Sequence, residues 1–331
     1  MKKTMKELAA LTGFSPATIS RVLTKNKSVS AETRRDVEKA LSGIDYLPTR
    51  SPRKKYSKKT VLVISGETSS NFHTLLFSTM SSMLRERGYF VLVGHSGFDE
   101  HLEEEYVKYA HALDYCGIIM ITPMDTPELT GLLTRSSCPV VLVNRYLRSV
   151  DLDAVYMDNY RAGYVVAKHL TDMGHRRIAC IDGGNKSTAI VDRLSGFMDA
   201  LADAGVPRED CYVWEGDLLK ESGNRFGKLY IDSLHEYTAV FSFNEPMARG
   251  FVETVQENGL VIPHDVSVIC IAPMVVNITG NVKLSCVIHN AELLGKTAVE
   301  MLMDRLGGLE QAPRKIVFPP QLCVQDSVKK L

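Results

Sequence analysis

Side chains that often carry chemistry are present in this chain, but not at the spacing that catalysis requires. Asp182 is followed by Gly183 and Gly184, a pair that could turn the chain around a phosphate. The pair lacks the GxGxxG spacing of a dinucleotide-binding loop, and Asp182 with His175 is not a credible catalytic set on spacing alone. The HExxH, GxSxG and Walker A sequences do not occur. We therefore expect no enzyme activity and no cofactor.

Cysteine chemistry is also not expected. None of the seven cysteines forms a CxxC pair, and most lie in or beside apolar runs. This scatter is typical of reduced core thiols rather than of a metal or redox site. The cysteines are Cys116, Cys138, Cys180, Cys211, Cys270, Cys286 and Cys323.

Charge separates one end of the chain from the rest. The formal net charge is zero, yet residues 1–60 hold fifteen Lys and Arg against five Asp and Glu, a net charge of +10. The remaining residues hold 24 basic and 34 acidic side chains, a net charge of −10. A basic segment on an acidic body indicates a polyanionic partner for that segment alone.

The composition is that of a globular protein, with 45% apolar and 24% charged residues. No apolar run reaches the roughly 18 residues of a membrane helix. The lysines at the N-terminus are not followed by the apolar stretch of a signal peptide. We expect a cytoplasmic protein without a membrane partner.

Three short helices are predicted in residues 1–47. Apolar residues recur at helical spacing from Met5, and Gly13 interrupts them with a turn. Ser15 followed by Pro16 marks the start of a second helix, and a third is expected from about residue 31 to 42, capped by Ser30. Two short helices around a glycine turn, with a supporting third, form an all-α helix-turn-helix module.

From residue 61 the chain alternates between apolar strands and amphipathic helices. Continuous rather than alternating apolar strands are typical of parallel α/β sheets covered on both faces. The prolines and basic run of residues 48–60 form the boundary, and the length of 61–331 favours two lobes. Strands are expected at 61–64, 90–93, 117–121, 140–143, 155–157, 178–181, 240–243 and 266–271.

These residues resemble the lactose-repressor (LacI/GalR) family of bacterial transcription regulators. In the first segment the similarity lies in residues 5–23, 29–34 and 46–48. In the body it is clearest in residues 158–163, 169–179, 193–197, 244–250 and 259–268. Together the two parts cover nearly the whole chain.

The resemblance implies a two-lobed periplasmic-binding-protein-like fold, with Rossmann-like, doubly wound parallel sheets, three crossovers and a ligand in the cleft. It divides the chain into a DNA-binding domain of residues 1–47, a linker of 48–60 and an effector-binding and dimerisation domain of 61–331. Lobe 1 would comprise about 61–159 and 290–317, and lobe 2 about 160–289 and 318–331.

The resemblance also implies the residues that contact double-stranded DNA. The second helix would face base edges in the major groove, where Arg21 can fork onto guanine and Ala17 can offer a methyl group to thymine. Hydroxyl groups around it would hold phosphates, although each alone could be a helix cap. The implied DNA-binding residues are Thr4, Ser15, Pro16, Ala17, Thr18, Ser20, Arg21, Ser30, Thr33, Arg50 and Lys55.

A small-molecule effector would lie at the carboxyl ends of the strands. Arg193 is the strongest candidate, because a guanidinium can bind hydroxyls, a carboxylate or a phosphate through two parallel bonds. His73 could contact the ligand or be structural. The residues that match the family's effector positions are Phe72, His73, Asn144, Arg145, Ser187, Arg193, Leu218, Phe243 and Asn244.

Two features depart from the family. Cys270-Ile271-Ala272-Pro273 stands where the family usually has Gly-Phe-Asp-Asp, and Lys283-Leu284-Ser285-Cys286-Val287 replaces its proline–threonine pair. Ala272 cannot accept a hydrogen bond from a sugar. We therefore expect an effector that is anionic and sugar-derived, or one that offers few hydroxyls to that side, rather than an ordinary free sugar.

The linker departs as well. Lys55 stands near the position where the family has a leucine that wedges into the minor groove, and Pro52 disfavours helix before it. We expect residues 49–58 to be extended or disordered without DNA and to contact it mainly by charge. A slipped alignment would instead make Tyr56 the wedge.

The sequence thus predicts a nucleoid-associated, homodimeric regulator, a repressor of a carbohydrate-utilisation operon that binds a pseudo-palindromic operator under the control of an effector. A ligand-independent DNA-binding protein with a degenerate sensor is the main alternative. A transport binding protein would share the body but needs a signal peptide and no helix-turn-helix.

Overall fold

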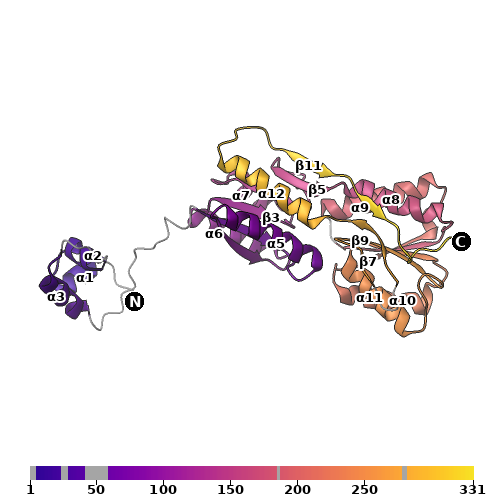
Figure 1. The fold of residues 1–331 in the computed structure, drawn as a ribbon, viewed down its shortest axis with the longest axis horizontal. Helices are drawn as coiled ribbons and strands as arrows, with labels where there is room; N and C mark the ends of the chain where they lie inside the picture. Colours follow the sequence, from indigo (N-terminus) through magenta and orange to yellow (C-terminus); the bar gives the residue numbers. More distant parts are fainter. Residues whose placement is uncertain (1–4, 24–28, 42–58, 185–186, 278–281) are drawn as a thin grey trace. The chain divides into compact units, whose positions relative to one another are not determined.

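The computed structural model describes residues 5–23, 29–41, 59–184, 187–277 and 282–331 (Figure 1). The chain divides into two compact units, residues 1–56 and 57–331, which we call the head and the body. Most of the predicted linker, from residue 48 to residue 58, lies outside the described residues, together with Arg50, Lys55 and Tyr56.

The head is the predicted three-helix module, comprising α1 (Met5–Thr12), α2 (Pro16–Leu23) and α3 (Ala31–Leu41). Gly13, at φ +73°, makes the turn between α1 and α2 in a conformation that side chains rarely adopt. One apolar residue or more from each helix enters a small core of Leu8, Ile19, Val22 and Val37. The helix-turn-helix prediction is confirmed.

The first lobe of the body is a six-stranded sheet in which all neighbours are parallel, in the order β11-β5-β4-β3-β1-β2. Leu76, Met80 and Leu302 are among the helix residues buried against it. Its elements are β1 (Thr60–Ser65), α5 (Asn71–Glu86), β2 (Phe90–His95), α6 (Glu100–Ala112), β3 (Gly117–Met120), α7 (Pro127–Thr134), β4 (Val140–Val143), β5 (Asp153–Met157), α12 (Ala291–Leu306) and β11 (Lys315–Phe318).

The second lobe repeats this plan with the strand order β12-β10-β9-β8-β6-β7. Phe197, Phe226, Phe241 and Phe251 fill much of its core. Its elements are α8 (Asn159–Asp172), β6 (Ile178–Asp182), α9 (Thr188–Asp203), η1 (Arg208–Asp210), β7 (Cys211–Glu215), α10 (Lys220–Ser233), β8 (Ala239–Ser242), α11 (Glu245–Glu257), β9 (Ser267–Ala272), β10 (Ser285–Ile288) and β12 (Gln321–Cys323).

The chain passes between the lobes three times: from β5 to α8, from β10 to α12 and from β11 to β12. The predicted two-lobed α/β architecture is confirmed. One detail differs, because β12 pairs antiparallel with β10 in an otherwise parallel sheet. This short strand returns directly beside β10 after the third passage, so no crossover helix is needed.

Strand β2 also departs from the expectation of strands covered on both faces. It is the edge strand of the first sheet, and Phe90, Leu92 and Val93 are about half exposed. Its sequence is as apolar as that of a central strand, yet part of its surface meets solvent. An exposed apolar edge of this kind is typical of a surface that pairs with another chain.

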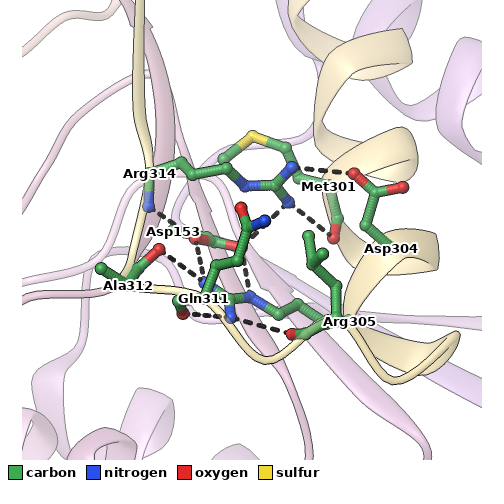
Figure 2. A network of polar contacts seen from close by, with 8 residues as sticks. Asp153, Met301, Asp304, Arg305, Gln311, Ala312 and Arg314 are labelled. Carbon is green, nitrogen blue, oxygen red and sulfur yellow. Dashed lines mark hydrogen bonds and ion pairs between the residues drawn. The ribbon is translucent and has the colours of Figure 1, made fainter.

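A network of hydrogen bonds and ion pairs surrounds Asp153, at the start of β5 in the first lobe (Figure 2). Its buried carboxylate accepts hydrogen bonds from Nε and Nη2 of Arg305 at 2.9 and 2.8 Å, and from the Arg314 backbone at 2.7 Å. Arg314 also binds Asp304 at 2.8 Å. The network ties α12 and the segment leading to β11 onto β5, so the strand that arrives last in the sequence is held in the sheet.

Among the described residues, no helix is long and apolar enough to cross a membrane.

Candidate functional site

The outer face of α2 carries the three residues that the resemblance assigns to base edges of DNA. Pro16, Ala17 and Arg21 are exposed, whereas Ile19 and Val22 point into the head core. The core therefore fixes the helix while leaving a guanidinium, a methyl group and a proline ring at its surface. A helix of this kind fits the major groove of DNA.

The hydroxyls near this face form two capping pairs. Ser15 Oγ accepts a hydrogen bond from the Thr18 backbone at 3.1 Å and lies 2.8 Å from Thr18 Oγ1. Ser30 and Thr33 repeat both contacts at the start of α3. Ser15 and Ser30 therefore cap the N-termini of α2 and α3, and these N-termini have the positive dipole ends that attract phosphates.

The structure does not describe the remaining head residues assigned to DNA. Thr4, Arg50 and Lys55 lie outside the described residues. Ser20 belongs to α2, but its side chain is not described.

The body holds a cavity of about 440 Å³ between its lobes. Residues that follow or end strands of both sheets line it, as expected for doubly wound folds. Eight of the nine predicted effector residues are among the lining residues: Phe72, His73, Asn144, Arg145, Arg193, Leu218, Phe243 and Asn244. Ser187 is the exception, because it is the N-cap residue of α9 and does not line the cavity.

Backbone strain is concentrated around this cavity. Among the described residues, Phe98, Asp114, Asn144 and Leu218 are the non-glycine residues with left-handed backbone, at φ between 54° and 75°. All of them except Asp114 line the cavity. Such conformations cost about 1–3 kcal/mol each and occur most often at ligand sites, where the surrounding structure maintains them.

The first lobe contributes a carboxylate–imidazole pair at the start of α5. Nδ1 of His73 lies 2.5 Å from Glu67 and 2.8 Å from Ser70 Oγ, while its Nε2 is buried without a partner. Glu67 also accepts hydrogen bonds from Ser69 and Ser70. Burial alone would raise the pKa of Glu67. The hydrogen bonds from Ser69 and Ser70, and the hydrogen bond and charge of His73, instead hold this pKa well below its usual range. Glu67 therefore stays ionised and orients the His73 ring.

Phe72 and His289 form a flat wall of the cavity. Their rings stack at 4.2 Å with 20° between planes. Burial, with the charges of Arg193 and His73 nearby, lowers the pKa of His289 to about 3, so this imidazole is neutral. Its Nε2 is buried without a partner. His289 was not predicted, because β10, the strand that it follows, was not predicted either.

Arg193 projects from α9 and is only 5% exposed. Its Nη1 donates to the Phe243 carbonyl at 2.5 Å and its Nη2 to Asn159 Oδ1 at 2.6 Å, while its Nε has no partner. Burial lowers its pKa to about 10, so it remains charged at neutral pH. The arginine thus has neutral partners and retains an uncompensated positive charge.

A close helix crossing positions Arg193. A Cβ on Gly163 of α8 would stand 1.9 Å from the Arg193 carbonyl oxygen, and a Cβ on Gly196 of α9 would stand 1.9 Å from that of Tyr160. Only glycine at both positions lets α8 and α9 approach so closely. This approach places Asn159, at the start of α8, within reach of the Arg193 guanidinium.

Arg145 follows β4 in the first lobe and is 3% exposed. Its Nη1 makes one long hydrogen bond, of 3.4 Å, to the Pro123 carbonyl, and its Nε has no partner. Burial lowers the pKa of Arg145 to about 10, although the charge of Glu103 favours the charged form.

Ala272 lines the cavity, so the position where the resemblance leads one to expect an aspartate offers only a methyl group. Among the described lining residues the carboxylates are Glu67, beside His73, Glu245, paired with Arg249 at 2.6 Å, and Glu221. None of them forms an ion pair with Arg145 or Arg193. The inner part of the cavity is therefore positive.

The site's second-lobe side is completed by the loop around Leu218. Asn244 caps α11 through a 3.0 Å hydrogen bond from the Met247 backbone, and its Nδ2 donates to the Leu218 carbonyl at 2.7 Å. Asn244 therefore holds the loop and the helix together at the cavity wall.

Comparison with known proteins agrees with this arrangement. A model of the lacI family of bacterial regulatory proteins matches residues 4–49, and a model of a periplasmic binding protein-like domain matches residues 167–328. The HTH-type transcriptional repressor PurR of Vibrio parahaemolyticus is 28% identical over 99% of both chains. The HTH-type transcriptional regulator DegA of Bacillus subtilis is 26% identical over 100% of this chain and 99% of its own.

Solved structures are similar as well. The complex of the transcriptional regulator CelR with cellobiose is 26% identical, has a TM-score of 0.71, and the match covers 98% of this chain and 100% of CelR. The lac repressor dimer bound to operator and the anti-inducer ONPF has a TM-score of 0.74 at 21% identity. The match covers 99% of this chain and 100% of the lac repressor chain, and it shows the shared fold.

Proposed function

Because this chain belongs to the lacI family of bacterial regulatory proteins, it is a DNA-binding regulator of transcription, and we propose that it represses a carbohydrate-utilisation operon as a cytoplasmic homodimer. The observation that carries the regulatory part of this proposal is the interlobe cavity with its unpartnered buried polar atoms. The likeness to the cellobiose complex of CelR supports a carbohydrate-derived ligand.

In this proposal the effector is anionic and binds in the cavity against Arg193, whose charge no lining carboxylate compensates. Buried polar atoms usually have hydrogen-bond partners, and Nε of Arg193, Nε2 of His73 and Nε2 of His289 have none. A ligand supplies the missing partners. A degenerate sensor would have no need to keep such groups, and this disfavours the ligand-independent alternative.

The head binds a pseudo-palindromic operator through Pro16, Ala17 and Arg21 of α2. The hydroxyl groups at the N-termini of α2 and α3 and the basic linker contact phosphates. The half-exposed apolar edge at Phe90, Leu92 and Val93 supports pairing with a second copy. The lac repressor, which shares the fold, is a dimer when bound to its operator.

The test couples the two sites. A binding duplex is first selected from random sequences, and its affinity for the full chain is then measured by fluorescence anisotropy with phosphorylated sugars and sugar acids. We expect at least one anionic compound to change the affinity, and Arg193→Ala to lose that response while still binding the duplex. A neutral hexose that acts alone, or a response that survives in Arg193→Ala, would refute the assignment of the effector site.

A further inference from the structure

Three cysteines that lie far apart in the sequence form a row across the second sheet. Cys270 on β9 is the register partner of Cys286 on β10, and Cys286 is in turn the register partner of Cys323 on β12. Residues directly opposite each other in neighbouring strands point to the same face of a sheet. Cys270 and Cys286 also belong to the two segments in which this chain departs from its family. The row therefore offers two neighbouring pairs of thiols.

Cys286 and Cys323 can form a disulfide without a rearrangement of the sheet. Opposite residues of antiparallel strands have Cα atoms about 4.5 or 5.5 Å apart, and a disulfide needs about 4.4–6.8 Å. The thiol of Cys286 makes a long hydrogen bond of 3.9 Å to the Met274 carbonyl, which a rotation of the side chain breaks at little cost. Cys323 Sγ accepts a hydrogen bond from Nε2 of Gln325 at 3.2 Å.

The thiols of the row differ in their access to solvent. β12 is an edge strand of the second sheet, and Cys323 on it is half-buried. Cys270 and Cys286 are fully buried in the strands behind it. Burial raises the pKa of Cys286 to about 12, so this group is a thiol at neutral pH. An oxidant from solvent therefore meets Cys323 first, and the thiol beside Cys323 is that of Cys286.

We propose that Cys323 and Cys286 are a site of reversible oxidation, at which a hydroperoxide converts the two thiols into a disulfide. The Cys323 thiolate attacks hydrogen peroxide, so an S–O bond forms, the O–O bond breaks, and the released hydroxide takes up the proton that Cys323 lost. The Cys286 thiol then attacks the sulfenic acid on Cys323. An S–S bond replaces the S–O bond, and the proton of Cys286 leaves with the hydroxyl group as a second water.

The electrons balance in this reaction, because the two sulfurs together lose two electrons and the peroxide gains them. A thiol reductant reverses it by attacking one sulfur of the disulfide and releasing both cysteines through a mixed disulfide. Disulfides of this transient kind are the ones expected in a reducing compartment.

The disulfide joins two of the three passages between the lobes. Cys286 lies in β10, which leads through His289 of the cavity wall to α12, and Cys323 lies in β12, which follows the passage from β11. A covalent bond between β10 and β12 limits how far these two passages can move apart, and it also restricts the unfolded chain. The oxidation state of the pair therefore acts on the part of the body where the lobes and the cavity meet.

The test maps the thiols of the full chain after treatment with hydrogen peroxide. Free thiols are blocked with N-ethylmaleimide, and the chain is digested with trypsin. Trypsin cuts after Lys283, so Cys270 and Cys286 fall in different peptides and can be told apart. We expect mass spectrometry to find the peptides of Cys286 and Cys323 joined, and dithiothreitol to separate them. On a non-reducing gel the oxidised protein should run as a single chain.

The melting temperature measures the effect on the passages. The oxidised chain should melt about 5 °C higher than the reduced chain, and dithiothreitol should remove this increment. Cys323→Ser and Cys286→Ser should each lose the joined peptide and the increment. Cys116→Ser is the matched control, because it removes another half-buried thiol from the first lobe, and it should keep both.

Three results would overturn the proposal. The first is a bond between Cys270 and Cys286, and the second is a Cys286 that still reacts with maleimide after peroxide treatment, whether Cys323 is oxidised to a sulfinic acid or unchanged. The third is a joined peptide without a rise in melting temperature, which would overturn the restraint on the passages. The mapping uses the wild-type chain, so it decides the site even where a serine variant fails to fold.

Discussion

At the scale of single residues, the cavity depends on charge states that burial imposes. Arg193 could be singled out from the sequence because it matches a family position and because a guanidinium suits anions and hydroxyls. Its bonds to Phe243 and Asn159 could not be foreseen, since the three residues come from separate elements. His289 was missed for the same reason: only the folded sheet places it against Phe72.

The neutral state of His289 gives a pH dependence of stability. Its pKa is about 3 in the folded protein, against about 6.5 in an unfolded chain. Between these values the unfolded state binds a proton that the folded state does not, so stability falls as the pH drops below about 6.5. Urea unfolding followed by the fluorescence of Trp214, the only tryptophan, measures this loss.

From pH 7.5 to 5.5 the loss in the wild-type chain should exceed that in His289→Gln by about 1 kcal/mol. His111, His169 and His175, whose pKa values burial also lowers, contribute equally to both proteins and cancel in the comparison. Equal losses in the two proteins would show that His289 is already protonated in the fold.

At the scale of elements, helix contacts decide where the site residues stand. Gly163→Ala would bring a Cβ to 1.9 Å from the Arg193 carbonyl, so α8 and α9 must separate. We expect a loss of about 1–3 kcal/mol in the free energy of unfolding, with weaker ligand binding because α9 carries Arg193. Gly131→Ala in α7 is the control, since its nearest atom is the end of the flexible Arg135 side chain at 3.4 Å. A Gly163→Ala protein as stable as this control would disprove the tight crossing.

The Asp153 network predicts a second element-scale effect. Asp153→Asn removes the charge that holds Arg305 and Arg314, and should lower the free energy of unfolding by about 3 kcal/mol. Asp151→Asn is matched to it, because Asp151 is 81% exposed and forms a surface ion pair with Lys315, so the change should be below about 1 kcal/mol. Denaturant titration compares the two, and similar losses would mean that the network does not stabilise the first lobe.

Long apolar strands and capped helices could be predicted from the sequence because periodicity and capping are local. The strands at 211–215, 285–288, 315–318 and 321–323 were not predicted. The first two carry polar or sulfur-bearing residues that shorten the apolar run, and the last two are short segments of partial burial. Each is held by pairing to a neighbour distant in sequence, and no local pattern reports that.

At the scale of the whole molecule, the basic head and the acidic body have different proposed roles, DNA binding and ligand binding. The net charge of +10 in residues 1–60 favours DNA for that part alone, and the body's two sheets build the cavity in which we propose that the effector binds. Affinity for DNA should fall steeply as salt rises, because each phosphate that the head neutralises releases a counterion. In the proposed function, specificity then comes from base contacts of α2.

The most direct test of this account is the equilibrium binding of the full chain to a selected duplex and to a shuffled duplex of the same composition. The account predicts a two-fold symmetric selected site that binds two chains, with at least ~10³-fold preference over the shuffled duplex. Arg21→Ala should cost about 1–3 kcal/mol on the selected duplex only. Equal affinity for both duplexes, or equal weakening of both by Arg21→Ala, would contradict it.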